Sequence, residues 1–453
     1  MKGFFGDGLL LGSASAERLY AAVRELPIID YHCHLNEYEI RNDIGFENLG
    51  ALWLGGDHYK WRAMRLCGVD ERFITGDATD YEKYRQYAKI FPRLCGSPLY
   101  YWTQLELKEL FGITAPLSDE TAEEIWKAAN EQLTEMHVSD ILRRFRVEYI
   151  ATTNDPTDKL DAHGVCGETR VAPTFRPDRM LTCERAALDD LRQAAGMARI
   201  ATLDDEKAAL VKRLDWFSSH GCVISDHGMD FLPAADCGEV FAGAVFNRLT
   251  KAPESVTAAE REQLASHLLY FLAGEYRKRG MVMQMHFGTY RNVNSKLFGR
   301  IGRDAGFDIM RGQVDVDRLA VFFDTLDARG SLPKTVLYSL NPTAVPAIAT
   351  LSGAFRNVRV GAAWWFNDTV AGIRQQLRTV AEYAALGTNL GMLTDSRSFA
   401  SYPRFDFFRR ILCDVVGEYV ERGEYDPRAA EALVTDICYR NIKEFLGIGG
   451  NNQ

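Results

Sequence analysis

The sequence has no excess of positive charge. Lys and Arg together number 53 against 62 Asp and Glu, which gives a formal net charge of −9 and a pI near 5.6. Nucleic-acid binding depends on a basic field that collects phosphates, so this balance argues against a nucleic-acid partner. An acidic protein that binds an acidic small molecule must supply local arginines, and these direct the search for a site.

Long apolar runs are missing as well. No stretch of 18 or more apolar residues occurs, so we expect no membrane-spanning helix. The N-terminal apolar patch is short, contains Asp7 and is broken by glycines, so it is better explained as a loop before a helix at 16–25 than as a signal peptide. The 9 cysteines never form Cys-x-x-Cys, a pattern typical of reduced thiols in the cytoplasm rather than of disulfides or structural zinc. We therefore expect a cytoplasmic protein.

Internal repeats, low-complexity tracts and Gly/Ser linkers are also absent, so composition marks no domain boundary. The chain is 47% apolar and 25% charged, as is usual for a soluble globular protein with a large core. We expect a single domain over residues 1–453, a length that an α/β barrel with insertions can reach.

Eight short β-prone runs are spread along the chain, and most of them end in polar residues. They are Pro27–His34, Val147–Asp155, Arg170–Arg176, Gly221–His227, Met281–Phe287, Lys334–Asn341, Val358–Asn367 and Leu390–Arg397. Helical patterns such as 257–279 and 370–386 separate most of these runs. Strands that alternate with helices predict a parallel sheet, and eight such units favour closure into a (β/α)8 TIM-like barrel.

The first two predicted strands are separated by a segment at about 35–146 that is rich in aromatic residues and helix formers. We interpret this segment as a mostly helical insertion on the first βα loop that partly covers the mouth of the site. A doubly wound open sheet is the alternative fold. The barrel is favoured because polar residues gather at the carboxyl ends of most predicted strands, where barrel enzymes build their active sites.

The first run ends in Asp-Tyr-His-Cys-His at 30–34. Residues i and i+2 of a strand point to the same side, so His32 and His34 project together and suit a divalent first-row metal such as zinc. Two ordinary strand histidines bonded to the backbone would give the same pattern. Asp395 ends the eighth run, which neighbours the first in a closed barrel, and it can complete a ligand set with open positions for catalysis. A helix N-cap is the alternative role for Asp395.

The run Asp-His-Tyr-Lys-Trp-Arg at 57–62 contains only polar or aromatic residues, which rarely build a core. His58 and Tyr59 offer proton transfer, and the arginine offers carboxylate binding. Taken alone, the run is better explained as a solvated helix start with Asp57 as its N-cap.

Further candidates stand near other predicted strand ends. Arg176 and Arg397 could receive a carboxylate through a forked guanidinium contact, whereas most arginines are solvated surface residues. His227 and His286 each end a predicted strand and could face the mouth. Trp365, in a Trp-Trp-Phe-Asn-Asp stretch, could pack against the C–H face of a sugar or belong to a buried aromatic cluster.

Several of these stretches occur together in one known family. They include Ile-Asp-Tyr-His-Cys-His at 29–34, Gly-Asp-His-Tyr-Lys-Trp-Arg-Ala-Met at 56–64, Phe-Arg-Pro-Asp at 175–178, Trp-Trp-Phe-Asn-Asp at 364–368 and Gly-Met-Leu-Thr-Asp-Ser-Arg-Ser-Phe at 391–399. In this order, and from end to end, the chain resembles the uronate isomerases (glucuronate isomerases) of the amidohydrolase superfamily.

The resemblance implies a (β/α)8 barrel with one divalent metal, commonly zinc, and a hexuronate substrate. The reactions it implies are the conversion of D-glucuronate to D-fructuronate and of D-galacturonate to D-tagaturonate, in hexuronate catabolism. The metal ligands it implies are His32, His34 and Asp395, and the substrate contacts are His58, Tyr59, Arg176 and Arg397.

Two features of the sequence bear on this branch of the superfamily. The sixth predicted strand ends at Asn341 without the histidine that hydrolytic members usually carry, and the fourth lacks the bridging lysine of two-metal members. His286 ends the fifth strand, where the superfamily often has a metal histidine, and is a candidate for either metal or substrate contact. A metal-dependent hydrolase or deaminase on the same barrel and a non-catalytic sugar-acid binder are the competing functions.

Aldose–ketose isomerisation moves one proton from C2 to C1 and another between the two oxygens, so it needs a base near carbon and groups that stabilise an enediolate. We hypothesise that Tyr59, made more acidic by Arg397, relays the carbon-bound proton while His58 and Arg397 stabilise the oxyanion. Asp395 would assist ring opening, and Arg176 would hold the C6 carboxylate. The sequence leaves open a metal-assisted hydride shift, and a homo-oligomer is among the assemblies it allows.

Overall fold

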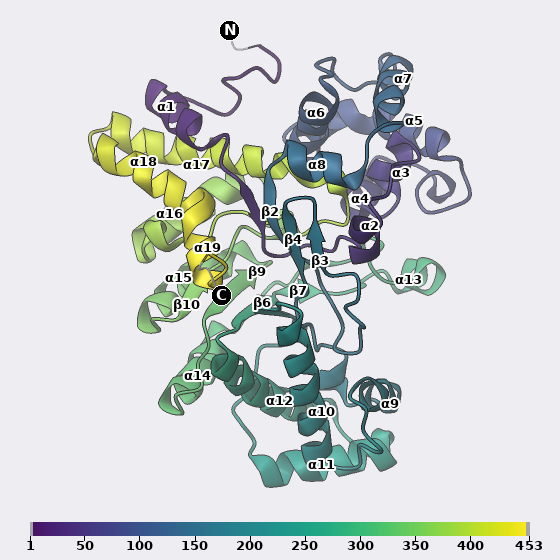
Figure 1. Cartoon of the computed structure of the whole chain (residues 1–453), viewed down its shortest axis with the longest axis vertical. Coiled ribbons are helices and arrows are strands. Elements are labelled where there is room, and N and C mark those ends of the chain that lie inside the picture. The colour runs from purple at the N-terminus through teal and green to yellow at the C-terminus, as the bar shows by residue number, and fades with distance from the viewer. Residues whose placement is uncertain (1–2, 450–453) are drawn as a thin grey trace.

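Ten strands form three sheets in the computed structural model, which describes residues 3–449 (Figure 1). The strands are β1 (Ile28–Asp30), β2 (Val147–Ala151), β3 (Gly164–Cys166), β4 (Thr169–Ala172), β5 (Ile224–Gly228), β6 (Val282–Phe287), β7 (Thr289–Tyr290), β8 (Ile309–Met310), β9 (Thr335–Ser339) and β10 (Val358–Val360). One large sheet has the order β1-β2-β4-β3 and the other β10-β9-β6-β5, while β7 and β8 form a separate ribbon. Every pairing in the large sheets is parallel except that of β3 with β4.

Seven of the eight predicted strands are present in the described residues, namely β1, β2, β4, β5, β6, β9 and β10. The prediction of a regular eighth strand at Leu390–Arg397 is wrong, because left-handed backbone at Gly391 (φ 73°) and Asp395 (φ 45°) interrupts the extended chain. This segment nevertheless runs beside the end of β1. The N–H of Asp395 donates to the carbonyl of His32 at 3.1 Å, and the N–H of His34 donates to the carbonyl of Ser396 at 2.9 Å.

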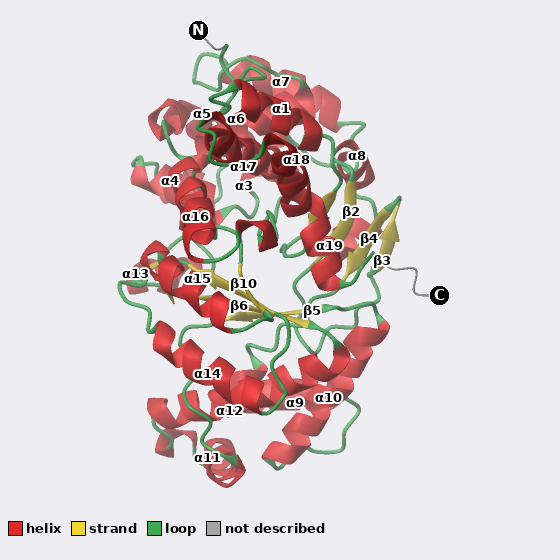
Figure 2. Cartoon of the chain, turned by 90° about the vertical axis from the view of Figure 1, so that its left-hand side faces the viewer, coloured by secondary structure: helices red, strands yellow, loops and turns green. Residues whose placement is uncertain are grey.

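The two large sheets are joined by the chain that follows β4, which runs beside β5. Phe175, which follows β4, forms isolated parallel bridges with Asn154 on one side and with Ser225 on the other. A cluster of buried apolar residues takes members from both sheets, among them Tyr149 of β2 and Val282 of β6. Both sheets therefore turn one face to a common interior, and Figure 2 shows their strands in the middle of the molecule with helices on either side.

The chain between β1 and β2 is mostly helical. Its helices are α2 (Glu37–Arg41), α3 (Leu49–Leu54), α4 (His58–Leu66), α5 (Asp80–Ile90), α6 (Pro98–Phe111), α7 (Ala122–Leu133) and α8 (Val138–Arg144). They pack with α1 (Ala14–Val23) and α17 (Pro403–Glu421) around one apolar core. In Figure 1 these elements lie at one end of the molecule.

Helices between the later strands form a second core at the opposite end (Figure 1). They are α9 (Arg185–Ala194), α10 (Leu203–Ser219), α11 (Glu239–Lys251), α12 (Ala258–Arg279), α14 (Val316–Ala328), α15 (Val345–Ala354) and α16 (Val370–Tyr383). The short α13 (Ser295–Ile301) buries no residue, and α18 (Pro427–Thr435) and α19 (Asn441–Leu446) are the last helices of the described chain. The helices predicted at 257–279 and 370–386 are confirmed as α12 and α16. The helix predicted at 16–25 is α1, which begins two residues earlier because Ser13 provides its N-cap.

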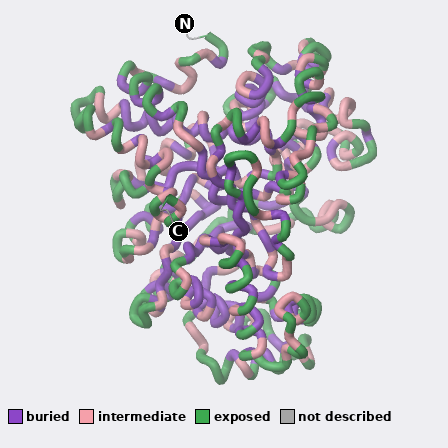
Figure 3. The backbone as a smooth tube through the Cα atoms, in the orientation of Figure 1, coloured by how far each residue is buried: buried purple, intermediate pink, exposed green. Residues whose placement is uncertain are grey.

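Burial follows this layering, and Figure 3 shows the buried segments running through the centre of the molecule. None of the helices in residues 3–449 is both long and apolar enough to cross a membrane. Each of the cysteines carries a free thiol. The single-domain prediction over 1–453 remains a prediction, and its residues 1–2 and 450–453 lie outside the described part.

Candidate metal and substrate site

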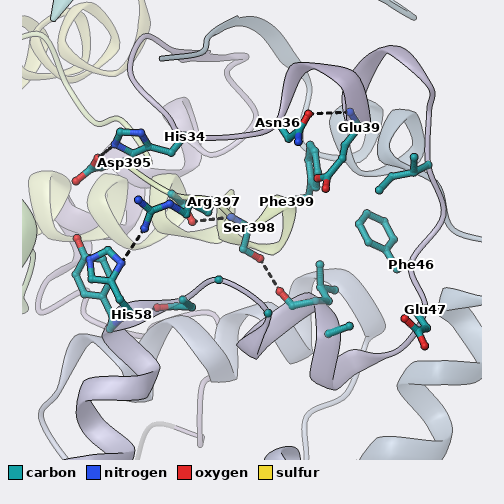
Figure 4. Close-up of a pocket in the computed structure, with 18 of the residues that line it drawn as sticks. His34, Asn36, Glu39, Phe46, Glu47, His58, Asp395, Arg397, Ser398 and Phe399 are labelled. Atoms are coloured by element: carbon teal, nitrogen blue, oxygen red, sulfur yellow. Dashed lines mark hydrogen bonds and ion pairs between the residues drawn. The ribbon is translucent and has the colours of Figure 1, made fainter. Parts of the chain in front are cut away.

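Two imidazoles and one carboxylate converge just beyond the end of β1. Nε2 of His32 lies 3.2 Å, and Nε2 of His34 lies 3.1 Å, from the same Oδ1 oxygen of Asp395. One ligand atom from each residue falls within 4.8 Å of the others, as a group that could hold a metal ion requires. Figure 4 shows His34 and Asp395 side by side at one end of a cavity.

The position of Asp395 is fixed by its neighbours in the fold. Its backbone adopts φ 45°, a left-handed conformation that costs a non-glycine residue about 1–3 kcal/mol. The buried carboxylate of Asp30 accepts hydrogen bonds from the N–H (2.9 Å) and hydroxyl (2.6 Å) of Thr394 and so holds the preceding residue. The indole of Trp364 donates to Oδ2 of Asp395 at 2.9 Å. Strain maintained by such specific contacts is typical of functional positions.

The charges of this cluster depend on one another. Burial opposes ionisation of Asp395, but hydrogen bonds from His32 and His34 hold its pKa well below the ordinary value. Burial lowers the pKa of His34 to about 4. At His32 burial also opposes protonation, but the charges of Asp226 and Asp395 outweigh it and the pKa is raised. The carboxylate of Asp395 therefore faces two imidazoles whose pKa values are shifted in opposite directions.

A second buried carboxylate, Asp226 of β5, organises two further candidates. Its Oδ1 lies 2.7 Å from Nδ1 of His286, and its Oδ2 lies 3.1 Å from NH1 of Arg176. The His286 ring stacks on Tyr338 at 4.2 Å and lies 4.7 Å from the ring of His32. Nε2 of His286 has no hydrogen-bond partner among the described residues. The contact with Asp226 thus fixes the ring and leaves Nε2 available.

The guanidinium of Arg176 is held from two sides. Its Nε donates to Asp178 at 2.9 Å, in addition to the contact with Asp226. Gly228 makes room for it, because a Cβ at that position would lie 2.2 Å from NH2 of Arg176. A guanidinium has five N–H donors, so Arg176 keeps donors for a third acceptor after these two contacts.

His58 and Tyr59 open α4, and Asp57 is its N-cap, which confirms the predicted helix start. The expectation that this start is solvated is wrong, because Asp57 and Lys60 are buried. Nδ1 of His58 lies 3.1 Å from NH1 of Arg397, whose NH2 lies 3.1 Å from Asp304 (Figure 4 shows the first contact). Burial, and next the charge of Arg397, lower the pKa of His58. Its imidazole is therefore neutral at neutral pH.

The environment of Tyr59 differs from the one we hypothesised. Burial, followed by the charge of Asp395, raises its pKa well above the ordinary value, so the phenol is not made acidic by its surroundings. Arg404, rather than Arg397, is the cation that opposes this shift, and its guanidinium lies 5.7 Å from the centre of the Tyr59 ring. Arg404 was not predictable here because it enters from α17, far along the chain.

Two cavities meet at this cluster. One of about 760 Å³ is lined by most of the predicted site residues, namely His32, His34, His58, Arg176, His286, Trp365, Asp395 and Arg397. The adjoining one, of about 670 Å³, is lined by Tyr59 and shares His34, His58, Asp395 and Arg397 with the first (Figure 4). His227 is fully buried and lines neither cavity, so the expectation that it faces the mouth is wrong.

Trp365 fits both interpretations offered for it. Its ring lies 5.5 Å from that of His58, edge to face, and it belongs to the buried apolar cluster between the sheets while also lining the larger cavity. Sequence reasoning missed Asp226, Asp178 and Asp304. The Ser-Asp-His stretch at the end of β5 was a signal for Asp226, whereas nothing local marked Asp304.

Comparison with known proteins places this geometry in context. The glucuronate isomerase family matches residues 1–446 of the chain. A uronate isomerase from Shouchella clausii is 43% identical over 465 aligned residues, which cover 98% of this chain and 98% of that protein.

Solved structures agree with the sequence comparison. The crystal structure of a uronate isomerase from Thermotoga maritima superposes with a TM-score of 0.95 at 36% identity, covering 98% of this chain and 100% of that one. The crystal structure of a glucuronate isomerase from Caulobacter crescentus gives a TM-score of 0.93 at 27% identity, covering 99% of this chain and 98% of that one.

Proposed function

The chain belongs to the glucuronate isomerase family and is a uronate isomerase, an aldose–ketose isomerase, and on that premise we propose how its residues bind and convert a hexuronate. The substrates are D-glucuronate, converted to D-fructuronate, and D-galacturonate, converted to D-tagaturonate. The observation that carries the proposal is the convergence of His32, His34 and Asp395 at the junction of two cavities lined by arginines.

The fold that supports this site is a (β/α)8 barrel in one domain, with 35–146 as an insertion beside its mouth. Three observations support closure. Phe175 links the two large sheets. The segment at 390–397 exchanges backbone hydrogen bonds with the end of β1. Both sheets contribute to one interior apolar cluster.

We assign one divalent metal, zinc from the donor set, to His32, His34 and Asp395. The fit rests on the Oδ1 oxygen of Asp395 that the Nε2 atoms of both histidines face, and on ligand atoms of all three residues that lie within 4.8 Å of one another. Bound there, the metal would polarise a substrate oxygen. His286 is assigned to a substrate hydroxyl, because Asp226 occupies its Nδ1, its Nε2 has no hydrogen-bond partner among the described residues, and it lines the larger cavity.

Arg176 holds the C6 carboxylate in this proposal. A forked guanidinium contact is charge-assisted and orients the sugar acid. Asp226 and Asp178 fix the guanidinium before substrate arrives, so less rotamer entropy is lost on binding. The face of Trp365 packs against the C–H surface of the sugar.

Proton transfer falls to the residues at the start of α4. Tyr59 relays the proton between C2 and C1, and Arg404 is the cation that lowers the cost of its ionisation. His58, neutral and bonded to Arg397, stabilises the developing oxyanion together with that arginine. Asp395 assists ring opening through the oxygen that does not face the histidines. The protein acts in the cytoplasm on a small-molecule substrate.

Incubation of the purified protein with glucuronate, followed by a ketose assay, tests the overall reaction. The same incubation in deuterated water distinguishes proton transfer through an enediol from a hydride shift. In the enediol route, the proton that the base removes from C2 can exchange with solvent before it is delivered to C1. Deuterium in the product at single turnover supports the enediol, whereas its absence would favour a hydride shift and remove the relay from Tyr59.

A further inference from the structure

A third cavity, of about 350 Å³, lies at the other end of the strands from the active site. Ile28, the first residue of β1, and Arg146, which directly precedes β2, both line it. The remaining walls come from α1, α6, α8 and α17. This cavity is therefore separate from both cavities that meet at Asp395.

The cavity is basic in a chain that is acidic overall. Its cations outnumber its acids among the lining residues, and the chain as a whole carries −9. The cations are Arg24, Lys108, Arg144, Arg146, Arg409 and Arg410, and the acids are Asp7, Glu25, Glu109 and Asp406.

The acids are largely engaged by the other cations. Asp406 binds Nε of Arg410 at 2.6 Å and also accepts from the hydroxyl of Tyr20. Glu25 pairs with Arg24 at 3.0 Å and with Arg146 at 2.8 Å. Asp7 and Glu109 lie at 3.7 Å and 4.0 Å from Lys108, and Glu109 also experiences the charge of Arg144.

Arg409 differs from the other cations of the cavity because it is buried and has no ion pair in the described residues. Its side chain is 4% exposed, and within residues 3–449 it forms no ion pair with a carboxylate. Its guanidinium donates only to backbone carbonyls, those of Arg24 (3.2 Å), Leu26 (2.9 Å) and Pro27 (3.0 Å). Its Nε has no hydrogen-bond partner in the described structure.

A buried cation without a direct ion pair costs free energy. Burial lowers the pKa of Arg409 even though the charge of Asp406 opposes that shift. The neighbouring thiol does not supply the missing charge, because burial raises the pKa of Cys438 to about 11 and keeps it neutral. Arg144, on α8, forms no ion pair in the described residues either, and it lines the same cavity. Two cations from helices far apart in sequence, the buried Arg409 and the exposed Arg144, thus border one cavity without a direct ion pair, although Arg144 acts electrostatically on the carboxyl of Glu109.

We propose that this cavity binds a small oxyanion, a phosphate or a carboxylate, whose charge compensates the buried Arg409 and which the exposed Arg144 helps to hold. The volume of about 350 Å³ accommodates such a group with its first waters. The anion would also act on the chain that enters β1, because Arg409 clamps the carbonyls of residues 24–27 directly before that strand. Occupancy therefore stabilises the folded chain.

The test is thermal unfolding of the full chain in sodium phosphate, sodium acetate and sodium chloride at equal ionic strength. Ligands that bind only the folded state raise the melting temperature in a saturable way. We expect phosphate or acetate to do so beyond chloride, and the stronger of the two identifies the oxyanion class. If all three salts change the melting temperature equally, the change is an effect of ionic strength, and the proposal is overturned.

Variants of residues that line the cavity test whether the rise in melting temperature comes from this site. Arg144→Gln combined with Arg146→Gln changes two exposed residues outside the active site, so the variant should fold and isomerise glucuronate normally. We expect it to lose the oxyanion-dependent shift or to require about tenfold more anion. Arg143→Gln is the matched control, because this neighbour on α8 pairs with Asp140 and does not line the cavity. An unchanged midpoint in the double variant, or an equal loss in the control, would place the anion elsewhere and refute this site.

Discussion

The carboxylate of Asp226 lies 2.7 Å from Nδ1 of His286, and both side chains are buried. Since the other Asp226 oxygen contacts Arg176 at 3.1 Å, one carboxylate positions two candidate substrate contacts at once. Asp226→Asn keeps the shape but removes the charge that fixes the imidazole and the guanidinium. We expect kcat/KM on glucuronate to fall roughly 10–100-fold, the usual effect of losing a partner that orients a site residue.

Asp178→Asn separates the two roles of Asp226. Asp178 contacts Arg176 at 2.9 Å but makes no hydrogen bond to His286 in the described structure. We expect the Asp178→Asn variant to have a higher KM with little change in kcat, whereas the Asp226→Asn variant should also have a lower kcat. Identical kinetic effects of the two variants would mean that Asp226 acts through Arg176 alone.

Metal content tests the proposed ligands. His32→Ala and Asp395→Ala each remove a donor from the cluster around the shared oxygen, so both should lose bound metal and most activity while the chain still folds. Elemental analysis of the purified variants measures this. His220→Ala is a suitable control, because His220 caps α10 and lines neither cavity of the site. Full metal occupancy in both ligand variants would refute the assignment.

Arg176→Lys tests carboxylate recognition. Lysine keeps the charge but loses the fork and the fixed contacts to Asp178 and Asp226, so it should not be a conservative change. We expect a loss on the order of 1.5–3 kcal/mol in transition-state binding, the usual contribution of a hydrogen bond to a charged group, measured as kcat/KM. If the lysine and methionine variants keep near wild-type kinetics, the carboxylate binds elsewhere, and Arg291 and Arg303 of the same cavity become the candidates.

A stability prediction comes from Glu206 on α10, which is fully buried and accepts a hydrogen bond from Cys183. Burial raises its pKa from 4.5 to about 8, so between these values the folded chain holds a proton that the unfolded chain releases. The contribution of this proton to the free energy of unfolding is complete below pH 4.5 and is lost as pH rises through about 8. The free energy of unfolding falls over this range by at most about 1.4 kcal/mol per pH unit. Glu206→Gln should flatten the fall in melting temperature between pH 5 and pH 8.

The control for Glu206 is Asp204→Asn, which changes an exposed acid on the same helix. It should leave the pH dependence of melting unchanged. If the melting temperature of Glu206→Gln depends on pH in the same way as that of the wild type, Glu206 is ionised in the folded chain.

Local sequence patterns were sufficient for most of the strands. The buried runs that end in polar residues predicted seven of them because periodicity and turn residues act within a few positions. The eighth run was apolar enough for a strand, but Asp395 has left-handed backbone. The contacts around it, from Thr394 to Asp30 and from Trp364 to Asp395, join residues that are distant in sequence. The short strands of the β7–β8 ribbon likewise carry no periodicity that a sequence can show.

The candidate site likewise contains residues that local spacing predicts and residues that only tertiary packing brings together. The i and i+2 spacing of His32 and His34 predicted that they meet, and they do meet at Asp395, although β1 ends at Asp30 and both lie beyond the strand. The partners that tune the site, Asp226 for His286 and Arg404 for Tyr59, enter from other strands and helices, and no spacing in the sequence links them. Pairings set by tertiary packing are visible only in the folded chain.

Tyr59→Phe tests the proton relay, because it removes the phenolic oxygen and keeps the ring packed against His58 and Trp365. Burial raises the pKa of Tyr59 well above its ordinary value, so the phenol can act as a base only if charges in the site stabilise its ionised form. Arg404 is the cation that opposes the shift. We therefore expect the phenylalanine variant to bind glucuronate with a near-normal Kd, and its kcat to fall on the order of 100-fold or more, the usual range for lost acid–base catalysis.

Arg404→Met should reproduce part of that loss without touching the phenol, because it removes the charge that favours ionisation of Tyr59. If the relay is correct, the wild-type rate should be limited on its acid side by this ionisation, and Arg404→Met should shift that limb to higher pH. Arg404 also donates to the carbonyl of Thr394 at 2.8 Å, so metal content must be checked alongside the pH profile. A Tyr59→Phe variant that keeps most of its kcat would show instead that Tyr59 only binds substrate. The proton would then move through Asp395, the one carboxylate at the junction of the two cavities that is also bonded to both histidines.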